Sequence, residues 1–105
     1  MAISLFRSFV SLIFCGLHST LVIASPDIAN GKLIDQQKCY ACHAKKVGFG
    51  NGDMIYTRSD GKVKNSAQLK AMVGLCNTEL RLDLFPEDEA DVAAFLNKQF
   101  YKFKP

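Results

Sequence analysis

Apolar side chains recur at helical spacing in three stretches of the chain, over about residues 26–38, 66–73 and 85–100. Positions three and four residues apart lie on one face of an α-helix, so each stretch can bury an apolar stripe. Residues 44–65 are rich in Gly, Asn and Asp, which is typical of turns and loops. No stretch has the strict alternation of a strand. The pattern therefore predicts an all-α fold.

Helix-boundary signals support two of these stretches. Ser66 is a favourable N-cap, and Gly74 follows the apolar positions of the second stretch as a natural stop. Pro86 and the three acids after it suit the first turn of the third stretch, where the helix dipole favours negative charge. We expect a second helix that ends near Gly74 and a third that continues to about Phe100.

Residues 1–24 differ in composition from the rest of the chain. They contain one charged residue, Arg7, followed by an apolar run over about residues 9–24. A bilayer-spanning helix needs about 20 apolar residues, and polar residues 18–20 interrupt this shorter run. The segment has the organisation of a secretory signal peptide.

Cleavage after Ala24 or Ser25 would leave residues 25–105 as the mature domain and would place it in the periplasm or otherwise outside the cytoplasm. An uncleaved anchor helix is one alternative. Lipoprotein processing at Cys15 is another, but bulky Phe14 precedes this cysteine, where a small residue would be expected.

From Pro26 onward the chain has 12 Lys and Arg residues against 10 Asp and Glu, a net charge of +2. Because the basic residues are interspersed with acids, this composition does not indicate nucleic-acid binding. A domain of about 80 residues has a marginal hydrophobic core. Its three cysteines, Cys39, Cys42 and Cys76, do not suit a disulfide framework, so another stabilising element is expected.

The pentapeptide Cys39–His43 has the pattern C-x-x-C-H, which is the attachment signature of c-type haem. Two thiols three residues apart on one helical turn can each add to a vinyl group at the same porphyrin edge. The next residue then directs its imidazole towards the iron. We expect one covalent haem c held by Cys39 and Cys42, with His43 as the proximal iron ligand.

Two other chemistries use C-x-x-C. A thioredoxin-like redox pair would follow a strand in a βαβ pattern, and the sequence shows neither. A zinc site would need a second pair of ligands, and no second C-x-x-C or H-x-x-x-H is present. Haem attachment explains the motif best.

Most of residues 27–105 resembles the small class I cytochromes c. The stretch 31–39, with Gly31 eight residues before Cys39, is similar to the N-terminal helix of that family, and residues 91–97 are similar to its C-terminal helix. The resemblance implies three to four helices around one haem, with the two terminal helices crossing where Gly31 meets Phe95. Asp35 departs from the family, which usually has an aromatic or aliphatic residue there.

The distal iron ligand is the main departure from the family, which places a methionine shortly before the last helix. No methionine follows Met72. The candidates are Cys76, which we expect in the loop after the second helix and close to the distal face, then Met72, and further Met54 and Asn77. The segment around Asn77 also resembles certain high-spin class I cytochromes, so an open or weakly ligated site is an alternative.

Basic and phenolic side chains of the central loop are candidates to bind the haem propionates, or are simply solvated: they are Tyr56, Arg58, Lys62 and Lys64. Around the attachment motif, Lys38, Lys45 and Lys46 could form a positive rim that steers an acidic partner, or could be solvated. His43 is the one histidine after residue 24, which excludes bis-histidine ligation within one mature chain.

These features predict an electron carrier and not an enzyme. A covalent haem in a small exported domain would pass single electrons between redox partner proteins, including membrane-bound ones. The alternatives are a high-spin haem protein that binds or senses oxygen, nitric oxide or a sulfur species, and a haem subunit of a larger redox enzyme. The sequence does not determine the oligomeric state.

Overall fold

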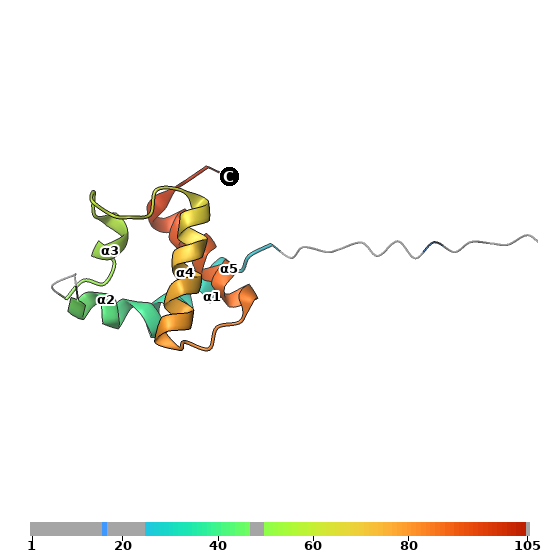
Figure 1. The fold of residues 1–105 in the computed structure, drawn as a ribbon, viewed down its shortest axis with the longest axis horizontal. Coiled ribbons are helices and arrows are strands. Elements are labelled where there is room, and N and C mark those ends of the chain that lie inside the picture. Colours follow the sequence, from blue (N-terminus) through green and yellow to red (C-terminus); the bar gives the residue numbers. More distant parts are fainter. Residues whose placement is uncertain (1–15, 17–24, 47–49, 105) are drawn as a thin grey trace, which may run out of the picture.

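The fold is drawn from a computed structural model that describes Gly16, residues 25–46 and residues 50–104 (Figure 1). Within these residues all regular structure is helical, which confirms the predicted all-α class. No helix among them is long and apolar enough to cross a bilayer. The predicted signal peptide, residues 1–24, lies outside the described residues except for Gly16.

The elements follow one another as α1 (Ile28–Ile34), η1 (Asp35–Cys39), α2 (Tyr40–Lys46), α3 (Met54–Thr57), α4 (Ser66–Leu80), α5 (Pro86–Leu96) and η2 (Asn97–Tyr101). The segments η1 and η2 are single π-helical turns that continue α1 and α5. The first predicted helix therefore extends through the C-x-x-C-H motif to Lys46. The third begins at Pro86, as predicted, and ends within one residue of the predicted end.

Helices α1 and α5 cross in close contact, and Gly31 makes the approach possible (Figure 1). A Cβ at this position would overlap the carbonyl oxygen of Asp91 and lie 2.9 Å from the Cβ of Phe95. The expected meeting of Gly31 and Phe95 is confirmed. Asn30 adds polar contacts to the crossing, because its amide nitrogen donates to Asp88 at 3.1 Å and to Asp91 at 2.8 Å.

The buried apolar core is small and consists of residues from α1, α4 and α5: Ile34, Leu69, Val73, Val92, Ala93, Phe95 and Leu96. Several large apolar side chains stay outside it. Leu75 and Leu80 are half-exposed, and Phe85 is 71% exposed. The helices therefore pack well at the α1–α5 crossing but leave much apolar surface of α4 uncovered by protein.

The predicted end of the second helix at Gly74 is wrong, because α4 continues to Leu80. A glycine inside a helix costs only about 1 kcal/mol relative to alanine. The residues that follow offset this cost, since Asn77 hydrogen-bonds to Glu89 of α5 at 2.7 Å. The helix ends instead at Arg81, whose φ of +51° is left-handed and stops the helical repeat.

The two helical glycines make a matched test of the packing. Gly31→Ala should lower the free energy of unfolding by about 1–3 kcal/mol, because the new methyl group meets backbone atoms of α5 that cannot move aside. Gly74→Ala should leave it unchanged or raise it by up to about 1 kcal/mol, because a Cβ there makes ordinary contacts and alanine favours the helix. Urea denaturation followed by circular dichroism measures both, and equal stability of the two variants would contradict this packing.

Candidate functional site

A cavity of about 440 Å³ lies between α2, α3, α4 and α5 and is lined mostly by apolar side chains. In Figure 1 these helices surround the centre of the domain. Four residues of the buried core, Leu69, Val73, Val92 and Leu96, form part of its wall. Its volume falls within the range of about 300–1,000 Å³ that is usual for small-molecule and cofactor sites. We call it the central cavity.

The attachment motif forms one wall of the central cavity. Cys39 is the last residue of η1, while Cys42 and His43 lie on α2, and all three line the cavity. Both cysteines are free thiols. Burial, with a further contribution from Asp35, raises the pKa of Cys39 to about 12. A redox-active C-x-x-C pair needs a lowered thiol pKa, so this environment argues against the thioredoxin-like alternative.

His43 is half-buried and presents a neutral imidazole to the cavity. Burial lowers the pKa of its ring, so that the unprotonated form, which alone can bind a metal, is favoured. Its Nδ1 atom is buried and has no hydrogen-bond partner among the described residues. The ring packs edge-on against Tyr56, with 5.5 Å between centroids.

Helix α4 forms another wall of the central cavity, through a stripe of side chains along one of its faces. Leu69, Met72, Val73, Cys76 and Leu80 all line the cavity at helical spacing. The prediction that Cys76 lies in a loop is therefore wrong, because α4 extends past it. Met72 and Cys76 lie one helical turn apart on the same face, so both predicted distal candidates reach the site.

The other two distal candidates do not line the cavity. Met54 is 42% exposed at the start of α3, and its neighbours Ile55 and Tyr56 line the cavity instead. The amide of Asn77 is used in the connection to α5. Its nitrogen donates to the carbonyl of Leu84 at 3.0 Å and to Glu89, and its oxygen accepts from the Leu84 N–H at 3.0 Å.

Of the basic and phenolic loop residues, three line the central cavity and one does not. Tyr56, Arg58 and Lys62 line the cavity, whereas Lys64 is exposed and is not among the described lining residues. The Arg58 guanidinium pairs with both carboxylate oxygens of Asp60 at 2.7 and 2.8 Å. The hydroxyl of Tyr56 points elsewhere, because it donates to Asp35 at 2.6 Å.

The three lysines near the motif do not form one rim, because only Lys38 lines the central cavity. Lys38 lines the cavity, and its ammonium group donates to the carbonyl of Leu82 at 3.0 Å, which ties η1 to the loop before α5. Lys45 and Lys46 are exposed at the end of α2 and are outside the described lining. Of the predicted rim, only these two remain as free surface charges next to the motif.

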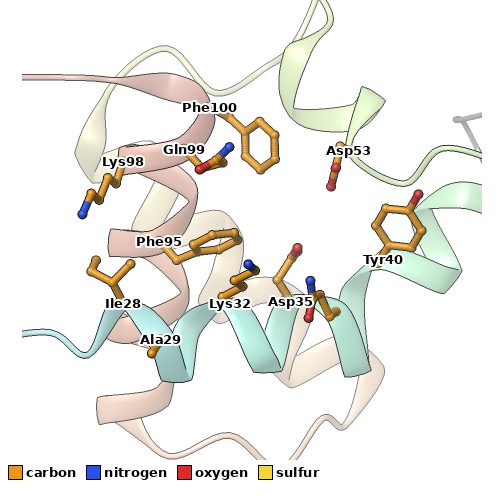
Figure 2. Close-up of a pocket in the computed structure, with 11 residues that line it drawn as sticks. Ile28, Ala29, Lys32, Asp35, Tyr40, Asp53, Phe95, Lys98, Gln99 and Phe100 are labelled. Atoms are coloured by element: carbon orange, nitrogen blue, oxygen red, sulfur yellow. The ribbon is translucent and has the colours of Figure 1, made fainter.

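A second hollow, which we call the outer groove, lies between α1 and η1 on one side and the end of α5 and η2 on the other (Figure 2). It measures about 780 Å³ and runs between Ile28, Lys32, Phe95 and Phe100. Neither His43 nor any of the described cysteines, Cys39, Cys42 and Cys76, lines it. The cysteines of the motif, Cys76 and His43 therefore line the central cavity, whereas Asp35 lines the outer groove.

Sequence reasoning missed two contacts that shape the site. The pair Asp35–Tyr56 joins η1 to α3, and Asp35 is only 2% exposed. Gly52 packs against Tyr40 so closely that a Cβ would overlap the backbone carbonyl oxygen of Tyr40. A charged residue in an otherwise apolar stripe was the available signal for Asp35, whereas nothing in the sequence marks Gly52 among its loop neighbours.

Asn77→Ala should destabilise the domain by about 1–3 kcal/mol, because it leaves the backbone groups of Leu84 without their side-chain partner. Its effect on any chromophore in the central cavity should be small, since the amide faces the α4–α5 connection. Thermal unfolding and the visible spectrum of the same sample measure the two effects. A large spectral change at unchanged stability would restore Asn77 as a distal ligand.

Comparisons with known proteins do not place this chain in a family. No family model, no curated protein and no solved structure matches it. The function is therefore argued from the residues around the central cavity.

Proposed function

We propose that this chain is an exported c-type cytochrome that carries single electrons through one haem in the central cavity. The observation that supports this function most is that the candidate haem-binding residues line one cavity. Cys39, Cys42 and His43 line the same apolar cavity as the two sulfur side chains of α4, Met72 and Cys76. Sequence-distant residues with the right donor atoms thus face one space of suitable size.

The donor set fits a c-type haem. Two free thiols, three residues apart, are available for thioether bonds. Burial of His43 favours the neutral ring, as an iron ligand requires before it binds. No cluster of three His, Cys, Asp or Glu side chains that could hold a metal ion occurs in the described part of the chain. Haem iron needs only one or two side-chain ligands, because the porphyrin supplies four.

The apolar lining fits the same group. Leu69, Val73, Val92 and Leu96 would cover the faces of a flat apolar ring and exclude water from it. Among the lining residues, Lys62 offers positive charge for carboxylates such as the haem propionates, whereas Arg58 is already paired with Asp60. The bound haem would supply a one-electron Fe(II)/Fe(III) couple, whose potential depends on its axial ligand, its burial and the hydrogen bonds around it.

The role of the chain is then to hold, orient and shield the cofactor. His43 would hold the proximal side. Met72 or Cys76 would approach from α4, and a thioether would favour a higher reduction potential than a thiolate. Lys45 and Lys46 leave positive charge near the motif, which suits transient docking of an acidic redox partner.

The visible spectrum of the holoprotein, produced in a cell competent for haem attachment, tests this function. We expect a low-spin spectrum in both redox states that carbon monoxide does not change, because α4 offers a sulfur ligand on the distal side. A high-spin spectrum that shifts with carbon monoxide would contradict electron transfer and would favour the binding or sensing of a small ligand.

Two variants assign the distal ligand. Met72→Ala and Cys76→Ala remove the two sulfur atoms of α4 separately, and we expect at least one to yield a spectrum that responds to carbon monoxide. Leu75→Ala, on the exposed side of the same helix, is the matched control and should leave the spectrum unchanged. If both sulfur variants match the control, α4 does not supply the ligand.

A further inference from the structure

Next to His43 lies a buried polar pair that electron transfer as such does not require. Asp35 is 2% exposed at the start of η1 and lines the outer groove, where Lys32 and Asp53 are also found. The hydroxyl of Tyr56 donates to Oδ1 of Asp35 at 2.6 Å, across 21 residues of sequence. A buried carboxyl group costs stability unless a hydrogen bond offsets its desolvation, so such a pair suggests a use for the site.

Tyr56 connects this carboxyl group to the imidazole. Its ring packs edge-on against His43, with 5.5 Å between centroids. On its other sides it packs against Phe100 at 5.1 Å and Tyr101 at 6.3 Å. The hydrogen bond and the three aromatic contacts together fix the ring of Tyr56 in one orientation.

The imidazole itself has no such hydrogen bond. A metal-binding histidine usually donates its second ring N–H to a carboxylate, a carbonyl or water, which sets its orientation. In the described part of this chain, Nδ1 of His43 is buried and unpartnered. The tightly held ring of Tyr56 is therefore the contact available to orient it.

We propose that Asp35 and Tyr56 are positioning residues for the proximal side of the haem site: Tyr56 orients His43 by ring packing, and the carboxylate of Asp35 behind it lowers the reduction potential. This inference rests on the proposed function. A negative charge stabilises the ferric state, which carries one more positive charge than the ferrous state, and it acts more strongly in a buried site than in water.

Electrostatic contact between the groups supports the geometry. Burial lowers the pKa of His43, while the charge of Asp35 acts in the opposite direction. Burial raises the pKa of Asp35, the hydrogen bond from Tyr56 opposes that rise, and the nearby charge of Asp53 adds to it. Asp35 and His43 thus lie within effective electrostatic range, with the phenol of Tyr56 bonded to the carboxylate.

Potentiometric titration of the holoprotein tests the proposal. Asp35→Asn keeps the shape and removes the charge, so it should shift the ferric-to-ferrous ratio at a fixed ambient potential three- to tenfold towards the ferrous form, where tenfold equals about 59 mV for one electron. Glu87→Gln removes the same charge at an exposed position of α5 and should not shift the ratio.

A second pair of variants keeps the test decisive if Asp35→Asn does not mature. Tyr56→Phe retains the ring and removes the hydroxyl bonded to Asp35, so the potential should change. Thr78→Val removes a hydroxyl from an exposed position of α4, outside the described lining of the central cavity, and should leave the potential as in the parent protein. A purely structural role would change the thermal stability of the first variant and not its potential.

The outcomes separate the two proposals. Potentials of Asp35→Asn and Tyr56→Phe that match their controls overturn this inference, while the holoprotein still carries haem and the proposed function stands. A parent protein that folds without acquiring haem overturns the proposed function itself.

Discussion

The packing of apolar side chains around the central cavity is the constraint on which the rest of this structure depends. Leu69, Val73, Val92 and Leu96 are at once core residues and cavity wall. The hydrophobic core is therefore one-sided: it is closed by protein at the α1–α5 crossing and open towards α2. A domain of this size gains little from protein packing alone, so a large apolar cofactor in the cavity would complete the core as well as carry the chemistry.

The rigid part of the fold positions both walls of the cavity. The close crossing at Gly31 and the contacts of Asn30 fix α1 against α5. Because η1 and α2 continue α1 without a break, this crossing also sets the direction of the attachment motif. Asn77 hydrogen-bonds to Glu89 of α5 and so fixes the position of α4, with its stripe of cavity-lining side chains, relative to α5. Helix α5 thus positions both walls of the cavity, which come from separate parts of the sequence.

Much of this arrangement could be predicted from the sequence where the determinants are local. The C-x-x-C-H spacing defines its own geometry on a helical turn, and Pro86 with its following acids defines the start of α5. The resemblance to class I cytochromes c implied a crossing at Gly31 and Phe95, which agrees with the need for a residue without a side chain where two helices approach closely. The heme-binding character of the site itself stays a prediction from these residues.

The remaining features depend on contacts between distant residues. Gly74 resembles a helix stop, yet the partners of Asn77 in the following segment keep α4 helical, which moves Cys76 from a loop to a cavity-facing stripe. Tyr56 resembled a propionate ligand, but its hydroxyl meets Asp35 in the folded chain. Neither contact could be identified from spacing: Asn77 and Glu89 lie on different helices, and residues 47–65, which include Tyr56, have no periodic pattern that fixes their path.

Mass spectrometry of peptides from the mature protein, after extraction of all non-covalent haem with acidified acetone, tests the central claim most directly. The account predicts one haem on the peptide that contains Cys39–His43, joined through both cysteines, and none on the peptide that contains Cys76. A folded protein, produced in a cell competent for haem attachment, in which that peptide has its unmodified mass would contradict it.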